Sequence, residues 1–145
     1  MKFLIDTSSL LAMVRYYIPF EKSDSLKNLQ TKTDSLYPYP KFFNMLDNEF
    51  ANHIQKSKLS EVGFESAKKI YLESADAKLI LYLLREKNKL GIDDSTLVTE
   101  ETSTDNDNKP FKKLPLICSY KDIPHCNLAV LLKEYYKIKL SEYVI

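Results

Sequence analysis

Acidic residues stand at three points of this chain where chemistry on a phosphate group could be built. Asp6 directly follows a short apolar run, Asp76 opens a strongly periodic segment, and the pair Glu100-Glu101 follows a β-branched run. Carboxylates that gather at one point repel one another unless they share a cation. An all-oxygen ligand set suits a hard divalent ion such as Mg²⁺ or Mn²⁺, which activates a water for in-line attack on a phosphodiester.

Two short strands are expected to position these acids. Residues 3–5 are fully apolar and residues 96–99 are mostly β-branched, as in strands that are buried on both faces of a parallel sheet. If the strands are parallel neighbours, their carboxyl ends meet at the sheet edge where ligands bind in open α/β folds. Asp76 shares the apolar stripe of its helix and should face inward at the same rim. Asp6 has a second reading that stays open, as a simple cap of the helix that follows.

The rest of the chain is expected to be mainly helical, in a single α/β domain spanning residues 1–145. Proline-rich residues 31–42 are interpreted as an irregular connector, polar residues 102–109 as a loop, and residues 143–145 as a frayed tail or an edge strand. Hydrophobic periodicity, with Asn127 as a cap of the last helix, predicts the remaining elements. They are helices at 10–17, with capping hydroxyls at 7–9, and at 23–30, 42–54, 59–72, 76–90, 115–120 and from 128 onward, and a short third strand within 123–126.

Composition narrows the class of protein. The 145 residues are 44% hydrophobic and 28% charged, and only two are glycine, which argues against Gly-rich phosphate loops and against an all-β fold. No apolar run approaches the roughly 20 residues of a membrane span, and no signal peptide is recognised, so a cytoplasmic protein without membrane contact is expected. Cys118 and Cys126 are interpreted as buried thiols rather than as a disulfide or a zinc site. A net charge of +1 leaves nucleic-acid binding open.

An ordered set of motifs resembles the PIN-domain nucleases. The segments KFLIDTSSLLAM, SADAKLILYLL and TLVTEE follow one another as in that family, and KKLPLICSYKDIPHCNLAVLLKEY resembles the end of a bacterial branch of it. The likeness covers both halves of the chain and leaves residues 18–58 poorly matched. It implies a three-layer α/β/α fold with a small, mainly parallel sheet. It also implies a ribonuclease that uses Mg²⁺ or Mn²⁺, often the toxin of a toxin–antitoxin pair, with RNA as substrate and an antitoxin protein or a second copy as partner.

The resemblance assigns three acids residue by residue. Asp6 falls on the first family acid, Asp76 on the acid that opens the later helix, and Glu101 on the acid after the fourth-strand threonine. Asp is commoner than Glu at that last position, so Glu101 is a departure. Glu100 should point the opposite way along an extended chain and is the weaker candidate metal ligand.

The family's second acid has no clear counterpart. Glu49 is the acid with a plausible helical setting, and the alternative is a solvated helix face that it shares with Asp47. The strand that should precede it is missing, because Pro38 and Pro40 oppose a strand. The chain is therefore either an abbreviated fold or a degenerate enzyme, and both alternatives stay open.

Other residues have both a functional and a purely structural interpretation. In the family such hydroxyls as Thr7 and Thr99 bond the acids, although cap and strand roles explain them equally. The lysines Lys112, Lys113 and Lys121 could hold an RNA backbone or simply be solvated. The remaining candidates are favoured as ordinary structural or solvated residues: Asp93, Asp94, Asp105, Asp107, His53, His125, Tyr71, Tyr82 and Tyr135.

Three hypotheses follow from the sequence. The first is an Mg²⁺- or Mn²⁺-dependent endoribonuclease that uses Asp6, Asp76 and Glu101, with Glu49 as a fourth acid. The second is a PIN-like module that has lost catalysis and binds RNA or a protein partner. The third is a nuclease of the same mechanism that acts on DNA.

Overall fold

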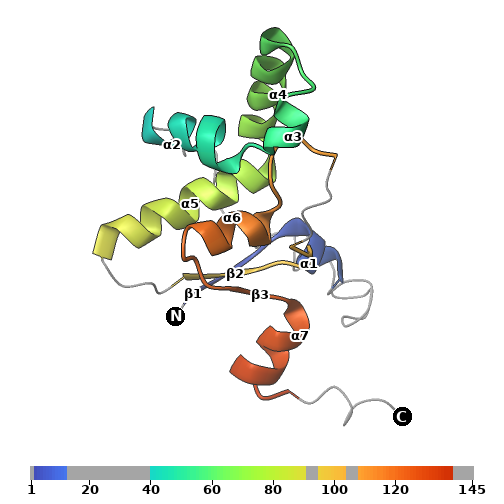
Figure 1. Ribbon diagram of the computed structural model, residues 1–145. Coiled ribbons are helices and arrows are strands. Elements are labelled where there is room, and N and C mark those ends of the chain that lie inside the picture. The colour runs from blue at the N-terminus through green and yellow to red at the C-terminus, as the bar shows by residue number, and fades with distance from the viewer. Residues whose placement is uncertain (1, 13–39, 91–94, 104–107, 139–145) are drawn as a thin grey trace.

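A computed structural model describes residues 2–12, 40–90, 95–103 and 108–138 of the chain. The described elements combine a small sheet with many helices (Figure 1). In chain order they are β1 (Lys2–Ile5), α1 (Thr7–Ala12), α2 (Pro40–Met45), the π-helical turn η3 (Leu46–Phe50), α3 (His53–Lys56), α4 (Glu61–Glu73), α5 (Ala75–Leu90), β2 (Ser95–Val98), α6 (Leu114–Tyr120), β3 (His125–Cys126), α7 (Leu128–Val130) and the π-helical turn η4 (Leu131–Tyr135).

The three strands form one parallel sheet in the order β1-β2-β3. Ile5 is in register with Val98, and Val98 with Cys126. The residues that follow the three strands therefore leave the sheet at one carboxyl edge, with Asp6 beside Thr99. This confirms the predicted strands and their parallel arrangement.

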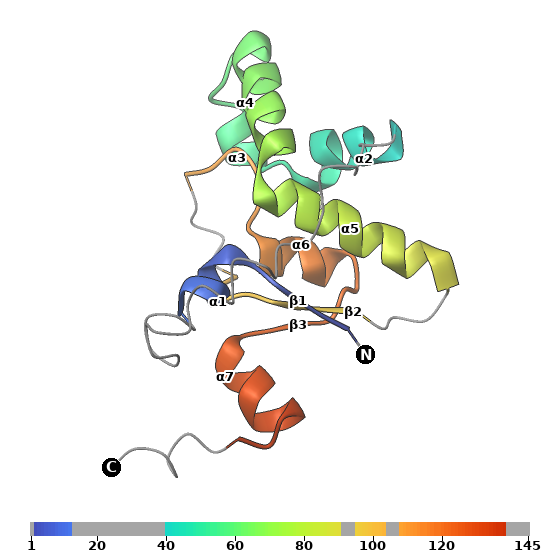
Figure 2. The same ribbon diagram turned by 180° about the vertical axis from the view of Figure 1, so that it is seen from behind.

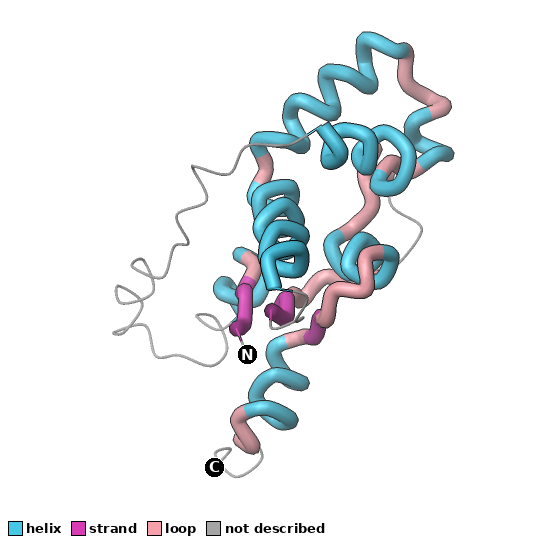
Figure 3. Tube along the Cα trace, turned by 90° about the vertical axis from the view of Figure 1, so that its left-hand side faces the viewer, coloured by secondary structure: helices cyan, strands magenta, loops and turns pink. Residues whose placement is uncertain are grey.

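Helices cover both faces of the sheet, with α5 and α6 on one side and α7 on the other (Figures 1 and 2). Strand residues alternate between the two faces, as the β pleat requires. Leu4 and Leu97 belong to the larger core, to which α2, η3, α4, α5 and α6 also contribute. Val98 belongs to a smaller core with Leu128 and Leu131. Viewed along the sheet, the strands lie between these helical layers (Figure 3).

One residue, Ser74, joins α4 to α5 and fixes the start of the helix that carries Asp76. The Ser74 hydroxyl donates to the carbonyl oxygen of Tyr71 at 2.6 Å and accepts from the Ala77 amide at 3.2 Å. It thus satisfies backbone groups of both helix ends. Because the junction is so short, the last turn of α4 and the first turn of α5 are held together at the rim of the sheet.

The helix predicted at 42–54 is wrong in its continuity. It is divided into α2, η3 and α3, and the chain is extended at Ala51 and Asn52. Ala51 there forms an antiparallel bridge with Phe111, and the Asn52 amide donates to the Pro110 carbonyl oxygen at 2.8 Å. Pairing with a distant segment thus replaces local helical hydrogen bonds.

Two further expectations need correction. Pro40 begins α2, so the irregular connector does not extend to residue 42, and proline suits the first turn of a helix because it needs no amide partner there. In α4, Val62 and Ile70 are 81% and 70% exposed, so they do not belong to the buried stripe predicted for this helix.

The remaining elements fall close to their predicted positions. Ser60 caps α4, Asn127 caps α7, and Leu79, Ile80, Leu83 and Leu84 form the buried stripe of α5. The predicted helix at 23–30, residues 13–17 of the first helix, the helix stop at Gly91, part of the 102–109 loop and the tail at 143–145 lie outside the described residues. Within the described part of the chain, no helix has the length and apolar character needed to cross a bilayer.

Candidate functional site

Asp6 is a buried residue at the carboxyl edge of the sheet, directly after β1. Its side chain is 4% exposed and accepts hydrogen bonds from the Ser8 hydroxyl at 2.9 and 3.0 Å, from the Ser9 amide at 2.7 Å and from the Thr99 hydroxyl. Asp6 therefore has the capping role that the sequence left open, since it bonds the first turn of α1, and it also accepts from Thr99, which directly follows β2. Thr99 has its predicted role, whereas the Thr7 side chain is exposed.

Asp76 lies in the first turn of α5 and is electrostatically coupled to the other acids. Burial raises the pKa of Asp76, and the negative charges of Glu101 and Asp6 raise it further, while Lys109 lowers it. Asp76 thus lies within the electrostatic field of the two other acids that the sequence singled out. The repulsion among them is the kind that a shared cation relieves.

Glu101 and Glu100 serve different helices. Glu101 Oε2 accepts from the Leu114 amide at 3.2 Å, at the start of α6, and Glu101 lines a cavity together with Asp76. Glu100 Oε1 accepts from the Leu128 amide at 2.7 Å, at the start of α7. Glu100 is thus committed to the opposite layer, in agreement with the predicted alternation, and its candidacy as a metal ligand is not supported.

Glu49 is not brought to this edge. Its carboxylate forms an ion pair with Lys121, which follows the last turn of α6, and its carbonyl oxygen accepts from Lys112 Nζ at 2.7 Å. Glu49 is absent from the lining of the cavity that holds Asp76 and Glu101. The structure therefore pairs Glu49 with Lys121 and does not support Glu49 as the fourth acid, and Lys121, which was left open between an RNA contact and a solvated lysine, is engaged in this ion pair.

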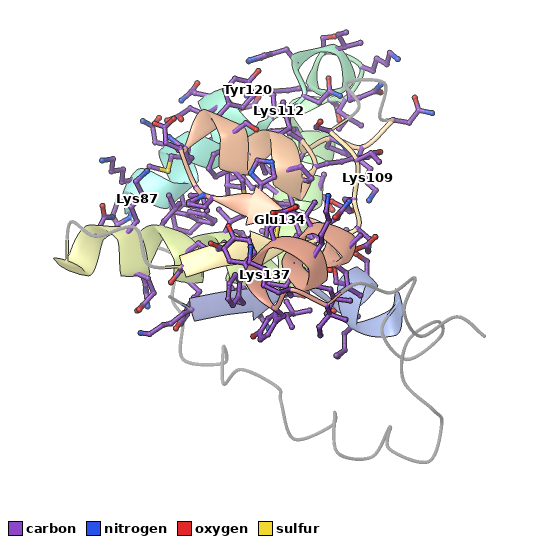
Figure 4. All side chains as sticks on the ribbon, turned by 90° about the horizontal axis from the view of Figure 1, so that it is seen from below. Lys87, Lys109, Lys112, Tyr120, Glu134 and Lys137 are labelled. Carbon is purple, nitrogen blue, oxygen red and sulfur yellow. The ribbon has the colours of Figure 1, made fainter. Side chains whose placement is uncertain are left out.

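A cavity of about 370 Å³ opens beside the acids, between the C-terminal half of α4 and residues 109–113. Asp76, Glu101 and Ser74 provide polar groups at its wall, and three lysines also belong to the lining. Figure 4 shows two of them, Lys109 and Lys112, the latter beside Tyr120, with Nζ 4.3 Å from the ring centroid. The complete lining is Ala67, Ile70, Tyr71, Ser74, Asp76, Glu101, Lys109, Pro110, Phe111, Lys112 and Lys113.

Sequence reasoning missed two contributors to this cavity. Tyr71 was expected to be an ordinary core or rim residue, but its ring stacks on Phe111 at 4.5 Å and its hydroxyl is buried without a hydrogen-bond partner. Burial raises the pKa of Tyr71, and the charges of Asp76 and Glu101 add to the effect. Lys109 was assigned to a solvated loop. The run KPFKK at 109–113 was the available signal, because it combines cations with an aromatic ring.

The other residues considered from the sequence take plain roles. Cys118 is buried, which raises the pKa of its thiol to about 12, and Cys126 is partly buried; both are free thiols. His53 is exposed, and His125 Nδ1 lies 3.1 Å from the Ile123 carbonyl oxygen. Tyr82 packs against the larger core and Tyr135 packs edge-on against Phe3. Four acids, Asp93, Asp94, Asp105 and Asp107, lie outside the described residues.

The carboxylate oxygens of Asp6, Asp76 and Glu101 are the kind of ligand that a hard cation prefers, but they do not form a complete coordination shell. Within residues 2–12, 40–90, 95–103 and 108–138, no three His, Cys, Asp or Glu side chains are grouped so that they could hold a metal ion. Asp6 already accepts from three donors, although a carboxylate has about four lone-pair sites. Asp76 and Glu101 remain at the cavity, and Mg²⁺ is commonly held by one or two carboxylates with waters and substrate phosphates.

Comparison of the chain with protein-family models, with curated proteins and with solved structures found no match.

Proposed function

We propose that this protein is a metal-dependent endoribonuclease of the PIN type, with the three-layer α/β/α arrangement of that family. Asp76 and Glu101 would hold Mg²⁺ or Mn²⁺, with Asp6 as the third acid beside them. The observation that carries the proposal is that Asp76 and Glu101 line one cavity together with three lysines, while Asp6, at the carboxyl edge of the parallel sheet, is near enough for its charge to raise the pKa of Asp76.

In this mechanism different residues of the chain would have different roles. A bound divalent cation supplies an activated water and neutralises the leaving oxygen of a phosphodiester. Ser8 and Thr99 fix the Asp6 carboxylate through hydrogen bonds, so its negative charge stays aimed at the edge. The lysines of the cavity wall would bind the phosphates that flank the scissile bond.

The neighbouring glutamates provide a matched test. Glu101→Gln and Glu100→Gln both keep a side-chain oxygen that can accept the amide hydrogen bond at their respective helices. We expect Glu101→Gln to slow Mn²⁺-dependent cleavage of single-stranded RNA by about 100-fold or more, because a metal ligand is lost, and Glu100→Gln to leave the rate within about twofold. EDTA should abolish the activity. Equal rates for both variants, or cleavage that persists in EDTA, would exclude the mechanism.

Asp6 is a poor choice for this test despite its central place. In Asp6→Asn one oxygen becomes an amide that must face the donors Ser8, Ser9 or Thr99, so loss of cleavage would be mixed with loss of stability. The same assay with DNA in place of RNA decides between the two nuclease hypotheses.

A second candidate function is a module of this fold that binds RNA or a protein partner without catalysis. It is favoured by the pairing of Glu49 with Lys121, which leaves the site without a fourth acid among the described residues, and by the open arrangement of Asp6, Asp76 and Glu101. Calorimetric titration with Mn²⁺ separates the candidates. The nuclease should bind Mn²⁺ and lose the binding in Glu101→Gln, whereas the module should show no heat that depends on Glu101.

A further inference from the structure

The cavity beside the acids is lined by more apolar residues than a metal site requires. Its sides away from Asp76 and Glu101 are formed by Ala67, Ile70, Pro110 and Phe111, and Ile70 is 70% exposed although it is a large aliphatic residue. A volume of about 370 Å³ lies within the range of about 300–1,000 Å³ that small-molecule sites occupy. The cavity therefore has room for a compact, largely apolar group next to the acids.

A buried hydroxyl in the same wall points to a ligand with a polar edge. Tyr71 Oη is inaccessible to solvent and has no hydrogen-bond partner, which is unusual because buried polar groups are nearly always paired. Its charged neighbours are Asp76 and Glu101, so the hydroxyl lies on the acid side of the cavity. Because this oxygen is closed off from solvent, a ligand in the cavity would hydrogen-bond to Tyr71 Oη only after the surrounding wall shifts to expose it, and it would then satisfy a group that the fold leaves unpaired.

Three lysines in the lining of the cavity carry positive charge. Lys109, Lys112 and Lys113 are spaced around Pro110 and Phe111 in one short segment. Antiparallel pairing holds this segment, because the Lys112 amide donates to the Phe50 carbonyl oxygen at 2.8 Å. A group that enters the cavity thus has both cations, which suit phosphates, and carboxylates in the surrounding wall.

We propose that this cavity binds one unpaired base of single-stranded RNA, the base of the nucleotide next to the phosphate at the acids. A base has apolar faces for the Ile70 and Pro110 side, a polar edge for Tyr71 Oη, and flanking phosphates for the lysines. A base within a duplex is stacked and paired and does not enter. The identification of the phosphate position rests on the proposed nuclease function, whereas the binding of the base does not.

The test measures binding without catalysis. Anisotropy titrations with short fluorescent homopolymeric oligoribonucleotides, and with a matched duplex, are carried out in EDTA. Ile70→Glu places a charge in the cavity wall. Val62→Glu makes the same change two helical turns away on α4, at a residue that is 81% exposed and does not line the cavity. Tyr71→Phe removes the hydroxyl and keeps the ring that stacks on Phe111.

We expect Ile70→Glu to weaken single-strand binding at least about fivefold, the low end of what the loss of one base contact costs, and Val62→Glu to change it by less than about twofold. Tyr71→Phe should alter the ratio of affinities among the homopolymers while its unfolding temperature does not fall. Equal effects of the two glutamate substitutions, tighter binding of the duplex, an unchanged ratio in Tyr71→Phe, or no binding of the wild-type protein would each overturn the proposal. A peptide or protein ligand would appear as the last of these outcomes.

Failure of this inference is distinguishable from failure of the nuclease proposal. Mn²⁺-dependent cleavage that is lost in Glu101→Gln, combined with equal binding by the two glutamate variants, rejects the base site and keeps the nuclease. Binding that depends on Ile70, combined with no cleavage under any metal condition, keeps the base site and rejects the nuclease.

Discussion

Glu100 and Glu101 show how strongly one position along an extended chain can change the role of a side chain. Successive residues of a strand point to opposite faces, and the chain keeps this alternation just past β2. Glu100 therefore accepts from Leu128 on the α7 side, while Glu101 accepts from Leu114 on the α6 side. The alternation of the two glutamates was predictable from the pleat, whereas the choice of Glu101 as the acid of the site came from the family resemblance.

Asp76 provides a prediction on stability and pH. Its pKa in the folded protein is raised above the ordinary aspartate value, chiefly by burial, so the folded state holds this proton more tightly than the unfolded state. Stability therefore falls as pH rises from the ordinary pKa through the raised one, and the penalty persists at neutral pH. We expect Asp76→Asn to increase the free energy of unfolding at pH 7 by about 0.5–2 kcal/mol, with the gain vanishing at acid pH below the unfolded pKa.

Urea unfolding of both proteins across this pH range checks the expectation. Glu61→Gln is the control, because Glu61 is also an acid in the first turn of a helix but is exposed. Losing its favourable interaction with the helix dipole should lower stability slightly, by about 0.3–1 kcal/mol. An Asp76→Asn variant that is less stable than the wild type at pH 7 would contradict the placement of Asp76 beside the other acids.

The acids that follow strands or open helices were predictable, and the one inside an irregular segment was not. Asp6 and Glu101 are placed by the parallel register, and Asp76 by the periodicity of α5, both of which are visible in the sequence. Glu49 lies in the π-helical turn η3, where helical periodicity no longer indicates direction, and its partner Lys121 is 72 residues away. Such a long-range ion pair leaves no local signal.

At the scale of elements, the same limit explains the division of the helix predicted at 42–54. The apolar spacing of Phe42, Leu46 and Phe50 is helical, and these residues are buried as expected. The break at Ala51 comes from pairing with residues 110–112, which nothing within the segment reveals. The strands were found correctly because they are short apolar or β-branched runs, and the long helix α5 because its burial is periodic, whereas an isolated bridge between distant loops has no such pattern.

That bridge supports a prediction. Lys112→Pro removes the amide that donates to the Phe50 carbonyl oxygen, and it leaves the carbonyl of a fully buried residue without that partner. We expect a loss of about 1–3 kcal/mol in the free energy of unfolding, measured by urea denaturation. Lys112→Ala is the control, because it keeps the amide and removes only the side-chain contacts to the Glu49 carbonyl oxygen and the Tyr120 ring. Equal losses in both variants would show that the side chain, not the bridge, matters.

At the scale of the whole molecule, charge is nearly balanced, with 21 basic and 20 acidic residues. A net charge of +1 provides little long-range attraction for a polyanion. Any affinity for nucleic acid must then come from a local arrangement, and the cavity wall at residues 109–113 concentrates three lysines in five positions. The salt dependence of RNA binding therefore differs according to whether the RNA contacts the cavity wall or the surface as a whole.

If each of the three lysines contacts one phosphate, log K for single-stranded RNA should fall with log salt with a slope of about −2, at roughly −0.7 for each contact. We expect Lys113→Ala to reduce this slope by about 0.7 and to weaken binding of all homopolymers alike, because phosphate contacts carry no base information. Lys58→Ala, at an exposed lysine that does not line the cavity, is the control and should leave the slope unchanged. Contacts confined to the cavity wall make the slope shallow and make it depend on Lys113. A wild-type slope much steeper than about −2, or equal changes of slope in both variants, would therefore assign RNA binding to charge spread over the whole surface.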